Sequence, residues 1–94
     1  MLICRLAYDA AGRESERQTH YDAHRAHLRS DLAKSIVQSG PLFAPDGTNR
    51  KIGALIVFDV DDMGEVERFN AADPFIVHGV YNRIEFMRWD KTIG

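Results

Sequence analysis

The sequence predicts an α+β fold, in which one antiparallel sheet carries its helices on a single face. Three observations support this prediction. Apolar runs of strand length occur near both ends and in the middle of the chain, segments with helical spacing lie between them, and turn-forming residues mark the junctions. The order β-α-β-β-α-β, joined by right-handed crossovers, is that of a ferredoxin-like sandwich.

The first half of the chain contains one strand and one long segment with helical spacing. Residues 2–8 form a short apolar run that ends at an Asp-Ala-Ala-Gly turn, as a strand would. From Ser15, a suitable N-cap, apolar residues recur at the spacing of an amphipathic helix. Gly40-Pro41 cannot continue a helix, so we expect this helix to end near residue 39. A short extended piece at residues 42–44 should follow.

The second half repeats this alternation. Residues 52–60 form a nearly unbroken apolar run, which predicts a strand that is buried on both faces. Asp61 or Asp62 is expected to cap a second helix that extends to residue 72. Pro74 then allows a break or a fresh helical turn after Asp73. Residues 79–89 alternate between apolar and polar side chains and predict the last strand.

Length and composition limit the possible functions. The 94 residues are enough for one domain spanning 1–94, and a sheet face left uncovered in so small a chain predicts a homodimer. A net charge of −2 with dispersed basic residues argues against nucleic-acid binding. No apolar stretch approaches the roughly 20 residues of a membrane span, and no signal-peptide pattern occurs. With one cysteine and no disulfide pair, a cytoplasmic location is expected.

Three of the four histidines lie close together in the first helical segment. His20, His24, His27 and Asp31 project within an arc of about 60° on a helix. Such a stripe could bind a metal, supply a catalytic base, or form a polar border beside the core. The four side chains span about 16 Å along the helix axis, which is too far for one ion. The glutamate of the His-Glu-x-x-His motif is also missing, so we predict no metal site.

Short motifs distributed over nearly the whole chain resemble the YCII (YciI-like) family. They are Arg25-Ala-His27-Leu28, Ser39-Gly40-Pro41-Leu42, Ala72-Asp73-Pro74-Phe75, Gly79-Val80-Tyr81 and Arg88-Trp89. The resemblance implies a dimeric α+β barrel, with a cleft beside the first helix. It also implies a catalytic dyad made of His27 and Asp73. Phe75 departs from the family pattern, which often has a tyrosine at this place, so any role of that hydroxyl is lost.

The remaining candidates are expected to surround this dyad. Gly40 and Pro41, with Phe75, should shape the pocket wall, and Gly40 could adopt a positive φ that brings backbone N–H groups near a ligand. Arg5 interrupts an apolar strand. If it points into the barrel it favours an anionic substrate, and otherwise it forms a salt bridge at the sheet edge. His20 and His24 are interpreted as residues of the pocket rim.

The expected chemistry is proton transfer without a cofactor, because the sequence contains no phosphate-binding loop, nucleotide fingerprint or paired cysteine motif. His27 would remove a proton and Asp73 would orient it. Some family members resemble chloromuconolactone dehalogenases, so we expect elimination, such as dehydrochlorination, or isomerisation of a small activated ring compound such as a chlorinated aromatic catabolite. The alternative is a non-catalytic binding or assembly module, in which His27 fills space at a dimer seam and Asp73 only caps a turn.

Overall fold

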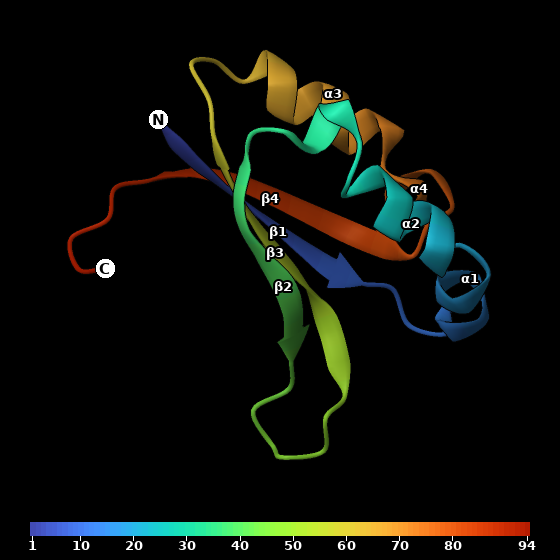
Figure 1. The fold of residues 1–94 in the computed structure, drawn as a ribbon. Coiled ribbons are helices and arrows are strands. Elements are labelled where there is room, and N and C mark those ends of the chain that lie inside the picture. Colours follow the sequence, from blue (N-terminus) through green and yellow to red (C-terminus); the bar gives the residue numbers. More distant parts are fainter.

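A computed structural model describes all 94 residues. The chain folds into four strands, four short α-helices and one 3₁₀ turn (Figure 1). In chain order these are β1 (Leu2–Asp9), α1 (Glu14–Thr19), α2 (Tyr21–His27), η1 (Asp31–Ala33), β2 (Ile36–Phe43), β3 (Lys51–Asp59), α3 (Gly64–Ala72), α4 (Pro74–Val77) and β4 (Tyr81–Trp89).

The four strands form one antiparallel sheet in the order β2-β3-β1-β4. All the helices lie on the same side of this sheet, and the β2–β3 hairpin projects beyond it (Figure 1). This arrangement confirms the predicted ferredoxin-like α+β fold. The central strand β3 buries Ile56, Val57 and Phe58 in succession, as expected for an apolar strand between two neighbours.

The sequence predicted one long first helix, and this prediction of its length is wrong. The helix is divided at His20 into α1 and α2, and α2 ends at His27. The Ser30 hydroxyl donates a hydrogen bond of 2.7 Å to the His27 carbonyl, which supplies a partner for one of the free carbonyls at the helix end. Residues expected to close the helix instead begin β2, where Ile36 pairs with Phe58 of β3. Strand pairing with an apolar partner therefore overrides the local helical spacing.

Two predicted boundaries in the second half agree with the structure. The Asp62 carboxylate accepts a 2.7 Å hydrogen bond from the Gly64 amide, with which α3 begins, although the N-cap position itself is Met63 and has no side-chain cap. Pro74 begins the separate helix α4, and Asp73 is its N-cap. Gly40 and Pro41, expected in a loop, lie within β2, and Gly40 does not have a positive φ. Proline is tolerated there because β2 is an edge strand.

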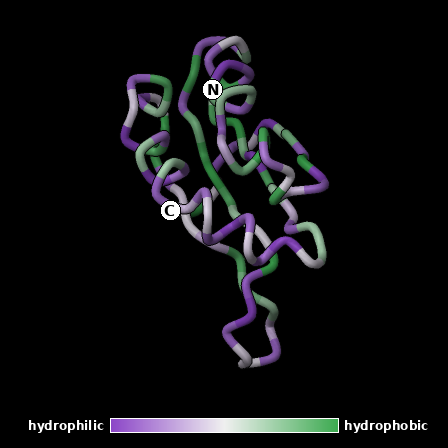
Figure 2. Tube along the Cα trace, turned by 90° about the vertical axis from the view of Figure 1, so that its right-hand side faces the viewer, coloured by the Kyte–Doolittle hydropathy of each residue, from purple (hydrophilic) through white to green (hydrophobic).

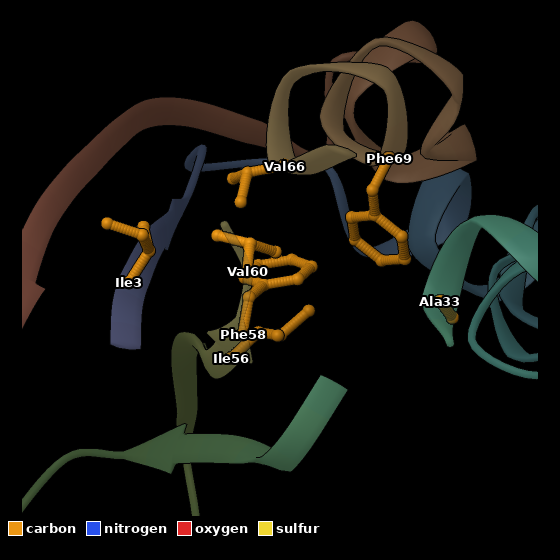
Figure 3. Packing of buried hydrophobic residues seen from close by; sticks show 7 residues of the cluster. All are labelled: Ile3, Ala33, Ile56, Phe58, Val60, Val66 and Phe69. Carbon is orange, nitrogen blue, oxygen red and sulfur yellow. The ribbon is translucent and has the colours of Figure 1, made fainter. Parts of the chain in front are cut away.

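The buried interior consists of two apolar clusters with a polar group between them. The larger cluster contains Val66 and Phe69 of α3, which point toward Ile56 and Phe58 of the sheet (Figure 3). The smaller cluster contains four buried residues, which are Ala7, Phe75, Val80 and Tyr81. The fully buried Arg5 contacts an aromatic ring of each cluster, Phe69 and Tyr81. The buried polar side chains therefore meet between the two apolar clusters.

The sheet face opposite the helices carries no helix (Figure 1), and it is apolar at the end that contains Cys4, whereas Glu85 and Arg83 lie beside Leu6 and Tyr8 toward the other end. In the strand register, Cys4 of β1 lies between Val57 and Met87, and Leu2 lies beside Trp89. Met87 and Trp89 are both exposed. The tip of the β2–β3 hairpin, which projects from the sheet, is largely hydrophilic (Figure 2). None of the helices is long and apolar enough to cross a membrane.

Candidate active site

Asp73 is the centre of the site, and its position follows from its role as a helix cap. It stands between α3 and α4, and its Oδ1 atom accepts a 3.0 Å hydrogen bond from the amide of Phe75. The following proline fits the first helical position, where an amide hydrogen would have no helical partner. The cap holds the carboxylate at a fixed orientation in the interior, with no solvent exposure.

His24 is the imidazole partner of this carboxylate. Its Nδ1 atom lies 2.8 Å from Oδ1 of Asp73, and both side chains are buried. Because a carboxylate only accepts hydrogen bonds, Nδ1 carries the hydrogen. In the neutral imidazole, Nε2 then has a free lone pair. Nε2 makes no hydrogen bond within the chain and is not among the sealed polar atoms, so a ligand can reach it.

The predicted pairing of His27 with Asp73 is therefore wrong. His27 lies nearly one helical turn beyond His24 on α2, and its Nε2 atom is 2.8 Å from the carbonyl oxygen of Phe69. A carbonyl accepts, so the ring donates from Nε2 and stacks on the Phe69 ring at 4.3 Å. His27 thus joins α2 to the end of α3, and His24 takes the place beside Asp73.

Arg5 also departs from the expected role of a pocket residue. It is fully buried behind Asp73, and its Nη1 atom donates to Asp73 Oδ2 at 2.9 Å and to Asn70 at 3.1 Å. Its Nε and Nη2 atoms have no hydrogen-bond partner. The guanidinium carbon lies 5.3 Å from the Phe69 ring centroid and 5.6 Å from that of Tyr81, distances at which ring faces attract a cation.

This environment keeps Asp73 ionised. Burial on its own raises the pKa of the Asp73 carboxyl, but the hydrogen bond from His24 and the charge of Arg5 together outweigh burial. The pKa of Asp73 is therefore held below its usual range. A permanent carboxylate on Nδ1 fixes the tautomer of His24 and stabilises the cation that forms when Nε2 accepts a proton.

A cavity of about 290 Å³ lies on the helix side of the sheet, and His24 forms part of its wall. Gly40, Pro41 and Phe75 line it, where the sequence analysis expected pocket residues, whereas Arg5 and His27 do not. The other lining residues are Arg17, Tyr21, Arg25, Leu28, Ser39, Lys51, Gly53, Ala54, Leu55, Ile56 and Tyr81. The volume is at the lower end of the range for small-molecule sites, so it suits a single ring.

Two aromatic residues hold the His24 ring in place. Phe75 stacks on it with centroids 3.9 Å apart and an interplanar angle of 4°, and Tyr81 approaches Phe75 edge-on at 5.6 Å. Burial raises the pKa of Tyr81 to about 12, so its hydroxyl is protonated at neutral pH. Tyr81 lines the cavity, and its hydroxyl has no hydrogen-bond partner within the chain.

The other two histidines lie outside this arrangement. His20 stacks on His78 with centroids 3.6 Å apart. No group of three or more His, Cys, Asp and Glu side chains is placed so that it could hold a metal ion. A larger hollow of about 450 Å³ lies between the β1–α1 loop and the start of β3. Neither His24 nor Tyr81 lines it, whereas both line the smaller cavity, which is therefore the candidate site.

Residues 1–90 match the family model of the YCII-related domain. The chain belongs to this family. Among solved structures it is similar to 5-chloro-2-hydroxyhydroquinone dehydrochlorinase of Burkholderia phenoliruptrix AC1100, in complex with 2,5-dihydroxybenzoquinone. The two share 29% identity with a TM-score of 0.82, and the match covers 96% of this chain and 94% of the dehydrochlorinase.

More distant structures share the fold alone. SnoaB, a cofactor-independent oxygenase from Streptomyces nogalater, is 15% identical with a TM-score of 0.55, over 98% of this chain and 93% of that protein. A NIPSNAP domain protein from Burkholderia xenovorans is 19% identical with a TM-score of 0.52, over 100% and 99% of the two chains. None of the curated proteins compared with this chain matches it.

Within this YCII chain, the sequence did not reveal the role of His24 beside Asp73, and it did not identify Tyr81 as a site residue. His24 lies inside the stripe that the sequence singled out, but only its contact with Asp73 distinguishes it from His27. Tyr81 has the spacing of a core residue, and it is indeed buried, yet it also lines the cavity. A signal for His24 exists on the helix, because His24 and His27 are three residues apart and share a face.

Proposed function

We propose that this YCII protein is a cofactor-independent enzyme that uses His24 as a general base. The observation that carries the proposal is the 2.8 Å contact between His24 Nδ1 and a buried carboxylate, at a residue that lines a cavity of one-ring size and whose Nε2 makes no hydrogen bond within the chain. Asp73 takes the orienting role, Tyr81 donates a hydrogen bond to a substrate oxygen, and Phe75 supports the imidazole.

The proposed reaction is an elimination, and the specific reaction that we propose first is dehydrochlorination of a chlorinated hydroxyhydroquinone. In the keto tautomer of such a ring, the chlorinated carbon also carries hydrogen. His24 Nε2 removes the proton of a conjugated hydroxyl, the electron pair moves through the ring, and chloride leaves with the C–Cl bonding pair. The products are a quinone and HCl, so the step needs no external oxidant. Isomerisation of a related ring would use the same proton transfers.

The similarity to a dehydrochlorinase supports this choice of reaction, because the resemblance extends over almost the full length of both chains. Tyr81 supports it from the site itself. A phenol that stays protonated can stabilise negative charge as it develops on a ring oxygen when a neighbouring hydroxyl loses its proton. The same cavity without turnover would make the protein a binding module, which is the competing hypothesis.

We also propose that the protein is a homodimer that joins through its uncovered sheet face. The strand register places apolar residues of β1, β3 and β4 side by side there, and Met87 and Trp89 are exposed in the single chain. Removing such apolar area from water is favourable by about 25 cal/mol per Å². Two such faces packed together would form a closed barrel with a shared core.

The first test measures chloride release from 5-chloro-2-hydroxyhydroquinone under anaerobic conditions, with His24→Gln and His27→Gln as a matched pair. Loss of a general base lowers the rate by about 10²–10⁴-fold, which is expected for His24→Gln. His27→Gln removes a hydrogen bond worth about 1 kcal/mol and should reduce stability while leaving most of the rate. Full activity of folded His24→Gln would overturn the assignment, and binding without turnover in wild type would favour the binding module.

A further inference from the structure

The charged side chains of the His24 cavity all have the same sign. Arg17 comes from α1, Arg25 from α2 and Lys51 from the start of β3, so three separate elements bring positive charge to one opening. No aspartate or glutamate lines the cavity. The whole chain has the opposite balance, with 14 acidic and 12 basic residues. The local excess of positive charge is therefore a property of this site.

The three cations are not equally available to a ligand. Arg17 forms an ion pair with Asp9 and lies over the Phe75 ring, with its guanidinium carbon 5.0 Å from the centroid. Arg25 and Lys51 form no ion pair. Arg25 lies 5.7 Å from the Tyr21 centroid, so its exposed side chain rests against a ring at the edge of the cavity. Two positive charges at the opening therefore lack a counterion.

The inner wall of the cavity has a different character. Leu28, Ile56 and Phe75 provide apolar surface, and His24 and Tyr81 provide the polar atoms for proton transfer. A hydroquinone ring suits this inner wall, because the ring is apolar and its hydroxyls, like the phenol of tyrosine, are un-ionised near neutral pH. The side chains without a counterion at the opening would attract a group that is negatively charged at the same pH. A carboxylate on the ring meets that condition and matches the planar fork of arginine.

We propose that the ligand of this cavity is a single-ring phenolic compound that also carries a carboxylate, selected by Arg25 and Lys51. Arg17 contributes less, because Asp9 already neutralises it. The inference rests on the proposed function only in treating the His24 cavity as the substrate site. It predicts a preference in binding, which can be measured without any turnover.

The test compares 2,5-dihydroxybenzoate with 2,5-dihydroxybenzamide by calorimetric titration at low salt, because the two differ in charge and hardly in size. Wild type should bind the benzoate roughly tenfold more tightly. Arg25→Gln and Lys51→Gln should each weaken benzoate binding about threefold to fivefold and leave benzamide binding unchanged. Added salt should reduce the preference, since the interacting charges lie at an exposed opening.

Arg29→Gln is the matched control. Arg29 is exposed just beyond α2 and does not line the cavity, so its loss changes net charge by the same amount and should leave the preference intact. Equal affinities for the two compounds in wild type, no measurable benzoate binding, or an equal loss in Arg29→Gln would each overturn the inference. His24→Gln should retain the preference. A preference without His24-dependent turnover would refute the proposed enzyme alone, and turnover without a preference would refute this inference alone.

Discussion

At the scale of single residues, the site depends on one carboxylate that is shared between two basic groups. Asp73 presents Oδ1 to His24 and Oδ2 to Arg5, and a backbone amide also donates to Oδ1. Arg5 balances the charge of Asp73 in a place without solvent, which lets the chain keep an ionised carboxylate in its interior. The guanidinium therefore acts behind the dyad and positions it, while His24 faces the ligand.

Stability should depend on pH through Asp73. Its pKa in the folded state lies below the unfolded value of about 4, so its contribution to stability is present above that value and is lost as pH falls through the folded pKa. We expect the free energy of unfolding, measured by urea denaturation, to decline below about pH 4. The double variant Arg5→Met/Asp73→Asn removes both charges and should show a smaller decline. An identical pH profile for this variant would contradict the assignment.

At the scale of elements, the register of short helices decides which side chain meets which. His24 and His27 both face inward from α2, but they differ by about 4.5 Å along its axis. The Phe69 carbonyl, in the last turn of α3, lies at the level of His27, and the cap of α4 lies at the level of His24. The close spacing of α3 and α4, with only Asp73 between them, therefore sets the identity of the dyad.

The pairing of β1 with β3 should tolerate no side chain at position 53. A Cβ atom on Gly53 would lie 2.0 Å from the backbone oxygen of Ala7, so Gly53→Ala must move the two central strands apart. We expect a loss of about 1–3 kcal/mol in the free energy of unfolding in urea. Gly40→Ala in β2 is the control, because a Cβ there meets nothing within 4 Å. Equal stability of the two variants would show that the strands can adjust freely.

At the scale of the whole molecule, one layer of helices covers only one of the two faces of the sheet. The helix side holds both apolar clusters and the site, while the opposite face has no helix over it (Figure 1) and leaves Met87 and Trp89 of β4 exposed. A chain of this size buries a limited fraction of its surface. The uncovered face is thus the natural place for the proposed dimer, and it leaves the cavity accessible from the helix side.

The proposed dimer should be sensitive to charge on that face. Met87→Lys places an ammonium group among apolar side chains, and we expect it to shift the protein to a monomer in sedimentation or light-scattering measurements. Val77→Lys is the control, because Val77 is 61% exposed on α4, away from this face. A wild-type protein that stays monomeric at high micromolar concentration would contradict the proposal.

Much of this architecture was predictable from local sequence. The strand periodicity, the start of α3 just after Asp62 and the break at Asp73-Pro74 depend on neighbouring residues, and the structure confirms them. The length of the first helix was not predictable, because Ile36 has the spacing of the helix and also the apolar character of the strand that pairs with β3. The burial of Arg5 depended likewise on a carboxylate 68 positions away.

The sequence by itself determined the order of elements, the family resemblance and the involvement of Asp73 with a histidine of the first helical segment. These follow from periodicity, capping chemistry and short motifs. Only the tertiary structure decided that this histidine is His24, that Arg5 supports the carboxylate from behind, and that positive charge from three elements meets at one opening. The physical reason is that distances across the fold depend on where helices end and how they pack, and two histidines on one helical face are equivalent until their neighbours are in place.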